Sequence, residues 1–384
     1  MAQLFVSGGE SYFGQGAVSC LSDIFKKYKF ERIVVVSDAE IVNAGVIQSV
    51  VKLLAKNRII YQVFDKVYHN PTVANVKAGV ELATSFNTDA FIAVGGGSVL
   101  DAAKAMSLMC ANREITDIRK LEGDVNKTKN KAMPLIAIPT NFSSGSEVSS
   151  VFMLSDMNNN RKISCKDKNC IPQEVIIDPD FVLSLNARQT ALSCASLFAL
   201  AVESYLSAKA WSVTEYYSLQ AVKLILENAK SAVNKNVKAK ENLLNAQYFA
   251  GLASSNGGLA LMHALSNALE VTHDVNHGVS CSLLLIPVLK FNAPSSGSKY
   301  KDLAIAMGAK VSDKASPADY RKTFINAVTK FFKELGVPKK LSEVGVKIND
   351  GDFMAECVLK DVHTQDNLKE VSKRKVLEIY KGIA

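Results

Sequence analysis

Three consecutive glycines, Gly95-Gly96-Gly97, separate a short apolar run from a segment that favours helix. The run 89–94 predicts a buried strand, and Ser98 and Asp101 have the spacing of a capping box, which predicts a helix beginning at Ser98. A strand that turns sharply into a helix leaves backbone N–H groups pointing outward at the positive end of the helix dipole. Those donors suit a phosphate, and glycines allow it to approach the backbone. A turn that binds nothing needs one glycine, so three favour phosphate binding.

Polar side chains also follow two other predicted strands. Asp38 comes directly after the mostly apolar run 33–37. An acidic residue in that position accepts hydrogen bonds from an adenosine ribose or caps a helix, and the sequence leaves both alternatives open. The loop after 135–138 is rich in hydroxyl groups that suit phosphate or ribose, although a polar surface loop has the same composition. Its hydroxyl residues include Thr140, Ser143 and Ser144.

These positions lie within a regular alternation of predicted strands and helices. Apolar, β-rich runs predict strands at 4–6, 33–37, 59–64, 89–94, 135–138, 151–154 and 174–177. Helical periodicity predicts helices at 17–29, 46–56 and 72–86 and from Ser98 onward. Strands separated by helices of this length form a parallel sheet with both faces covered.

Beyond residue 180 the pattern becomes helical. Helices are expected at 187–208, 214–231, 238–254, 258–272, 320–335 and 369–381. A chain of 384 residues is long enough for two domains. We therefore expect an α/β domain over 1–180 and an all-helical domain over 181–384.

The composition indicates a soluble globular protein, with 48% hydrophobic and 21% charged residues. The net charge of +8 is spread thinly, and a single tryptophan without basic–aromatic interleaving argues against nucleic-acid binding. Seven scattered cysteines without a CxxC pair indicate reduced thiols in a cytoplasmic protein. Neither a secretory signal nor an uninterrupted apolar stretch long enough for a bilayer is found, so we expect no membrane association.

Taken together, the motifs resemble the iron-containing (group III) alcohol dehydrogenase family over essentially the whole chain. The resemblance rests on Gly95-Gly96-Gly97-Ser98 with Asp101 and Lys104, Ile138-Pro139-Thr140, Gly145-Ser146-Glu147, and His277-Gly278 followed by Leu285-Ile286-Pro287 and Phe291-Asn292. It implies a Rossmann-like parallel-sheet domain that binds NAD(H), an all-helical C-terminal domain, and an active cleft between them. It also implies a homodimer or larger homo-oligomer.

The same resemblance implies roles for individual residues. Asp38 matches the position that binds the adenosine ribose and disfavours NADP. The turn Gly95-Gly96-Gly97-Ser98 matches the pyrophosphate site, and the family loop beside it corresponds to Thr140 with Ser143 or Ser144. Lys162 matches a lysine near the nicotinamide end, and we expect it to act with His263 and His277 as a catalytic residue.

The metal site is where the chain departs from the family pattern, which has an Asp and a His four residues apart on one helix and two later histidines. Such spacing places both side chains on one helical face. The first two positions are here Ser196 and Leu200, whereas the later two are His263 and His277. Two histidines rarely hold a catalytic divalent ion. We therefore expect no iron or zinc, unless other residues rebuild the site; the candidates are Glu203, His273 and Asp274.

The resemblance thus implies an NAD-dependent oxidoreductase for a small aldehyde or alcohol of the lactaldehyde and propanediol type, with metal-independent or weak activity. Without an ion, His263 or His277 must donate a hydrogen bond or a proton to the substrate oxygen. The alternative is a non-catalytic protein of the same fold with a nucleotide-binding, regulatory or structural role. The replaced ligand positions favour that alternative, as does Asn267, which stands where the family has a further histidine.

Overall fold

The computed structural model describes residues 3–124 and 126–384, which form two compact units joined between Leu185 and Asn186. The expected boundary after residue 180 falls inside a short 3-10 helix, Pro179–Val182, that still belongs to the N-terminal unit. We describe each unit by itself.

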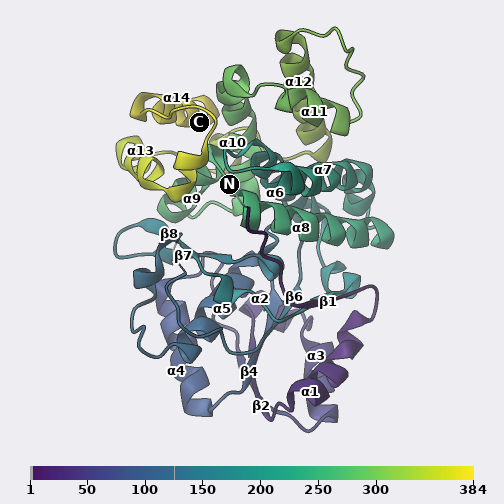
Figure 1. Cartoon of the computed structure of the whole chain (residues 1–384), viewed down its shortest axis with the longest axis vertical. Coiled ribbons are helices and arrows are strands. Elements are labelled where there is room, and N and C mark those ends of the chain that lie inside the picture. The colour runs from purple at the N-terminus through teal and green to yellow at the C-terminus, as the bar shows by residue number, and fades with distance from the viewer. Residues whose placement is uncertain (1–2, 125) are drawn as a thin grey trace. The chain divides into compact units, whose positions relative to one another are not determined.

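A six-stranded parallel sheet forms the centre of the N-terminal unit (Figure 1). Its strands run in the order β1-β9-β6-β4-β2-β3. Their bounds are Glu10–Phe13 for β1, Arg32–Val36 for β2, Ile60–Phe64 for β3, Ala90–Gly95 for β4, Leu135–Pro139 for β6 and Glu174–Ile177 for β9. The chain adds β3 on one side of β2 and then β4 on the other, which makes the carboxyl ends of β2 and β4 a topological switch point. Ligands of open α/β sheets bind at such points.

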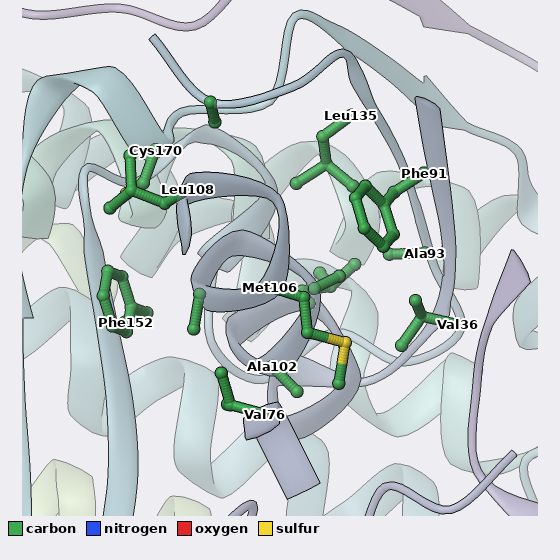
Figure 2. Packing of buried hydrophobic residues seen from close by; sticks show 14 of the residues in the cluster. Val36, Val76, Phe91, Ala93, Ala102, Met106, Leu108, Leu135, Phe152 and Cys170 are labelled. Carbon is green, nitrogen blue, oxygen red and sulfur yellow. The ribbon is translucent and has the colours of Figure 1, made fainter. Parts of the chain in front are cut away.

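Helices cover both faces of this sheet, as the sequence predicts. In β2, Val34 and Val36 pack into one apolar cluster, whereas Ile33 and Val35 pack into another on the opposite face. Figure 2 shows the first cluster. The helices of this unit are α1 (Leu21–Tyr28), α2 (Ala39–Asn43), α3 (Gln48–Lys56), α4 (Val73–Phe86) and α5 (Gly97–Ala111). Because both faces are buried at the centre of the sheet, β4 and β6 are continuously apolar.

Two predictions for the N-terminal unit are wrong. The first strand is not 4–6 but Glu10–Phe13, which gains hydrogen bonds from β9, whereas Leu4 is 74% exposed. The helix after the glycines begins at Gly97 and has no side-chain cap, so Ser98 and Asp101 form no capping box. The Asp101 carboxylate instead accepts hydrogen bonds from elements distant in sequence, as described below.

A second, three-stranded sheet in the order β5-β8-β7 lies in the same unit. Strand β7 (Val151–Asp156) pairs antiparallel with β8 (Arg161–Lys166), and β5 is Gly123–Asp124. The sequence predicts part of β7 but not β8, because Arg161, Lys162 and Lys166 break its apolar pattern. The hairpin matters for the site because it carries Lys162.

Helices make up the C-terminal unit. They are α6 (Ala187–Leu206), α7 (Ser212–Val233), α8 (Val237–Gly257), α9 (Leu261–His273), α10 (His277–Asn292), α11 (Lys299–Ala306), α12 (Pro317–Leu335), α13 (Gly351–Lys360) and α14 (Lys373–Ile383). The six predicted helices correspond to α6, α7, α8, α9, α12 and α14. Helix α10 was not predicted because it is apolar on nearly every side and so lacks an amphipathic period.

The expectation that no stretch could span a bilayer needs a correction at α10. Residues 277–295 are long and apolar enough to cross a membrane by length and composition alone. However, 67% of that window is buried inside the structure. A core helix has the same length and composition, so this property does not indicate a membrane span.

Candidate functional site

The glycine turn lies at the switch point of the sheet. Gly95 ends β4, Gly96 precedes α5, and Gly97 is the first helical residue. A Cβ atom on Gly96 would lie 2.6 Å from Asn141 Nδ2, and one on Gly97 would lie 2.6 Å from Ser144 Oγ. The turn therefore requires glycine because the loop after β6 packs directly against it. No side chain caps the first turn of α5, so its N–H groups suit an anion.

Asp38 lies at the carboxyl end of the neighbouring strand. Its carboxylate caps α2 by accepting a hydrogen bond from the Ile41 N–H at 2.8 Å. Ser37 donates to the Val94 carbonyl at 2.8 Å and so joins the ends of β2 and β4. Burial raises the pKa of Asp38 above its usual value. The capping role is therefore present, and Asp38 is placed beside the glycine turn, where the expected ribose role stays a prediction.

Buried Lys104 and the neighbouring Asp101 anchor the hydroxyl-rich loop. Lys104 is 0% exposed, and its ammonium group donates to the Ser146 carbonyl at 2.8 Å, the Ser146 hydroxyl at 2.9 Å and the Val151 carbonyl at 2.6 Å. The Asp101 carboxylate accepts hydrogen bonds from the Ser146 hydroxyl and, at 2.9 Å, from the Met153 N–H. These two motif residues therefore hold the loop and β7 against α5.

The remaining N-terminal candidates surround this anchor. The N–H of Thr140 donates to the Gly95 carbonyl at 3.0 Å, which fixes the start of the loop beside the turn. Lys162 lies on β8 opposite Ser155 of β7. Its charge also acts on Asp101, whose pKa is raised by burial against the lowering effects of Lys104 and Lys162. The structure thus gathers the predicted cofactor residues and Lys162 in one unit.

In the C-terminal unit, His263 is held by a buried carboxylate. Its Nδ1 lies 2.5 Å from Glu203, which also accepts hydrogen bonds from the backbone N–H of Met262 at 2.5 Å and of His263 at 3.1 Å. Nε2 of His263 is buried and has no hydrogen-bond partner among the described residues. Burial lowers the pKa of His263, against the raising effect of Glu203. The sequence identified His263, but not the partner that orients it.

His277 has a similar arrangement on the next helix. Its Nδ1 lies 2.6 Å from Glu270, which also accepts a hydrogen bond from the Ser266 hydroxyl at 2.5 Å. The Cys281 sulfur lies 3.5 Å from Nε2 and 4.0 Å from Nδ1. These similar distances place the sulfur beside the ring rather than along the outward axis of Nε2. Burial opposes protonation, but Cys281 and Glu270 raise the pKa of His277 well above its usual value.

The two histidines lie together, with ring centroids 5.8 Å apart. Ser196 belongs to the same neighbourhood, because its hydroxyl lies 4.0 Å from the Cys281 sulfur, and Leu200 is buried one helical turn further along α6. Asn267 donates to Asp361 at 2.9 Å. The structure therefore places Ser196 near the retained histidines.

His263 and His277 have no third metal-ligating side chain grouped with them among the described residues. In the described part of the chain, no three His, Cys, Asp or Glu side chains come together in a way that could hold a metal ion. Of the candidates for a rebuilt site, Glu203 is engaged by His263, and His273 forms a hydrogen bond with Thr272 at 2.7 Å. Asp274 ends α9 in a left-handed conformation. None of them completes a set of three ligands.

Comparison with known proteins gives one family for both halves of the chain. The pattern of the iron-containing alcohol dehydrogenases matches residues 9–179, and that of the C-terminal part of the Fe-containing alcohol dehydrogenase family matches residues 190–384. Lactaldehyde reductase of Escherichia coli (strain K12) is 32% identical over 380 residues, which are 99% of each chain. NAD-dependent methanol dehydrogenase of Bacillus methanolicus is 29% identical over 375 residues, 97% of each chain. The crystal structure of a 1,3-propanediol oxidoreductase superposes over 100% of both chains, with a TM-score of 0.94 and 27% identity.

Proposed function

The chain belongs to the iron-containing alcohol dehydrogenase family, and we propose that it is an NAD(H)-dependent oxidoreductase that works without a metal ion. Its substrate is a small aldehyde or alcohol of the lactaldehyde and propanediol type. The family supports the reaction class, and the relatives named above support the substrate class and the cofactor. A homodimer is part of the proposal, and light scattering on the purified protein tests it.

The N-terminal unit would hold the dinucleotide at the switch point of its sheet. The uncapped first turn of α5 suits the pyrophosphate, Asp38 the adenosine ribose, and Lys162 the nicotinamide end. The hydroxyl groups of Thr140, Ser143 and Ser144 would supply further hydrogen bonds. Ser98 contributes through its backbone, because its hydroxyl donates to the His69 carbonyl. A bound nicotinamide supplies or takes up the hydride.

The histidine pair of the C-terminal unit is the single observation that carries the proposal. Each ring is held through Nδ1 by a buried glutamate, and Nε2 of His263 is left without a partner. Metal-dependent enzymes polarise a carbonyl oxygen with the ion. An imidazole that donates a hydrogen bond or transfers a proton acts on the same oxygen, and such groups contribute roughly 10²–10⁴-fold to rate. The high pKa of His277 favours its cationic form, which stabilises negative charge on that oxygen.

Metal analysis combined with an activity assay tests this proposal. The dialysed protein should hold far less than one metal ion per chain and should reduce lactaldehyde with NADH equally well with and without a chelator. Replacement of His263 or His277 by Gln should lower turnover. Activity that depends on added iron or zinc would contradict the proposal.

A non-catalytic role is the second candidate, and specific residues favour it. Ser196, Leu200 and Asn267 stand where the family pattern has an Asp and two histidines. In that case the chain would bind NADH without turning over any aldehyde. Calorimetric titration with NADH, beside the turnover assay over a panel of small aldehydes, separates the two candidates.

A further inference from the structure

We propose that Glu203 is a positioning residue that fixes the tautomer of His263, with the proton on Nδ1 and a bare Nε2. His263, rather than His277, then takes up and returns the hydroxyl proton of the substrate. The catalytic part of this inference rests on the proposed function, whereas the tautomer follows from hydrogen bonding alone.

The backbone contacts of Glu203 require its carboxylate to act as a hydrogen-bond acceptor. It extends from α6 to the first turn of α9, where the preceding residue, Ala260, offers no side-chain cap. There it accepts hydrogen bonds from the N–H groups of Met262 and His263. Backbone N–H groups only donate, so Glu203 must be the acceptor in both contacts. A carboxylate already facing two fixed donors also accepts from the third, and the shared hydrogen therefore belongs to Nδ1 of His263.

The consequence for the opposite nitrogen is direct. A neutral imidazole with hydrogen on Nδ1 carries a lone pair on Nε2. Nε2 of His263 is buried and has no partner among the described residues, and an unsatisfied buried acceptor costs about 1–3 kcal/mol. The ring cannot turn to satisfy it without giving up the contact with Glu203. Nε2 of His263 can therefore accept a hydrogen bond from a bound molecule, and the hydroxyl group of an alcohol is a suitable donor.

His277 is not fixed in the same way. Oε1 of Glu270 lies 2.5 Å from the Ser266 hydroxyl oxygen and 2.6 Å from Nδ1 of His277. A hydroxyl group can donate or accept, so this contact does not force one protonation state on Glu270 or one tautomer on His277. The two backbone N–H groups bound to Glu203 thus fix the tautomer of His263, whereas the Ser266 hydroxyl bound to Glu270 puts no such constraint on His277.

In the direction of oxidation, the alcohol loses a hydride from its carbinol carbon and a proton from its hydroxyl group. The C–H bond of the carbinol carbon breaks, and hydride passes with its electron pair to the oxidised nicotinamide. The O–H bond breaks, its electron pair forms the carbonyl π-bond, and its proton bonds to Nε2 of His263. The resulting imidazolium is paired with Glu203 until it releases the proton to water. Aldehyde reduction uses the same groups in reverse.

Nitrogen-15 NMR of the full chain tests the tautomer without relying on activity. Long-range proton–nitrogen spectra of histidine-labelled protein, assigned with His263→Gln, should show an unprotonated Nε2 and a protonated Nδ1 in the wild type. Glu203→Gln places an amide group against Nδ1. Oε2 of Glu203 faces both the His263 N–H and Nδ1, so an NH2 group in its place gives up the backbone contact, donates to the ring and moves the hydrogen to Nε2. The spectrum of the variant itself shows whether the amide takes this orientation. Turnover should fall at least ~100-fold, because a histidine in the wrong tautomer cannot accept the proton. NADH affinity should not change.

Glu270→Gln is the matched control, because it changes the other glutamate–histidine pair and should leave the His263 signals as they are. A protonated Nε2 in the wild type would overturn the inference, and so would full turnover by a folded Glu203→Gln protein whose Nε2 is protonated. If that variant does not fold, the wild-type spectrum alone decides the tautomer. An unprotonated Nε2 in a protein that turns over no aldehyde would support the role of Glu203 and refute the proposed function. Failure of the tautomer inference and failure of the proposed function are therefore distinguishable.

Discussion

Gly97→Val is the sharpest test of the glycine turn as a phosphate site. A Cβ atom on Gly97 would lie 2.6 Å from Ser144 Oγ and 2.8 Å from Ser144 Cβ, distances that real side chains do not tolerate. The loop after β6 must therefore move, and overpacking of this kind costs about 1–3 kcal/mol of folding stability. The added methyl groups would also stand where a pyrophosphate approaches the first turn of α5. We expect a folded protein whose NADH affinity has fallen at least ~10-fold, which is about 1.4 kcal/mol.

Two effects can produce that loss, and a double variant separates them. Ser144→Gly removes the side chain that Gly97→Ala would meet, so the pair Gly97→Ala with Ser144→Gly relieves the contact with the loop. Because Ser144 is itself a proposed cofactor residue, Ser144→Gly alone is the reference. If the new Cβ blocks the phosphate itself, the double variant should bind NADH more weakly than Ser144→Gly and no better than Gly97→Ala. Gly382→Val is a control, because a Cβ there meets no atom within 4 Å.

The assay is calorimetric titration with NADH, with urea denaturation of each variant to show that it is folded. Unchanged NADH affinity in Gly97→Val would refute phosphate binding at the turn. Recovery of the Ser144→Gly affinity in the double variant would show that Gly97 serves the packing of the loop, and the phosphate argument would then lose this residue.

Four further outcomes are expected. Asp38→Gly should reduce the difference between NADH and NADPH affinity measured by calorimetry, because the carboxylate repels the 2′-phosphate. An unchanged difference would show that Asp38 does not contact the adenosine ribose. Burial raises the pKa of Asp38, so its carboxylate gains a proton at a higher pH than usual, and the wild-type gap should narrow as pH falls. The measurement is the ratio of the NADH and NADPH dissociation constants as a function of pH. If this ratio changes with pH equally in the wild type and in Asp38→Gly, protonation of Asp38 is not the cause. The double variant Ser196→Asp with Leu200→His should hold much more metal after dialysis than the wild type, and each single variant much less than the double variant. Stoichiometric metal in the wild type would contradict the inference that Ser196 and Leu200 replace two metal ligands. Lys104→Met should lower the free energy of unfolding by about 3–5 kcal/mol in urea denaturation, because it removes the cation beside Asp101 and the buried donor to the Ser146 and Val151 carbonyls. A loss below ~1 kcal/mol would contradict the anchoring role.

Local patterns in the sequence determined much of the N-terminal unit. The alternation of apolar runs and helical periods predicted the parallel sheet and its covered faces, because each run reports the burial of its own strand. The position of Asp38 after one strand and of the glycines after another placed both near the carboxyl edge of the sheet. Only the strand order β3-β2-β4 made them neighbours at a switch point.

Contacts between distant residues were decided by the tertiary structure alone. Asp101 has the spacing of a helix cap, yet its carboxylate binds Ser146 and the Met153 N–H, which lie 45 and 52 residues further along the chain. Glu203 likewise meets His263 across 60 residues and caps a helix other than its own. Spacing along a chain reports neighbours within one helix or strand, whereas a buried charge finds its partners wherever packing brings donors to it.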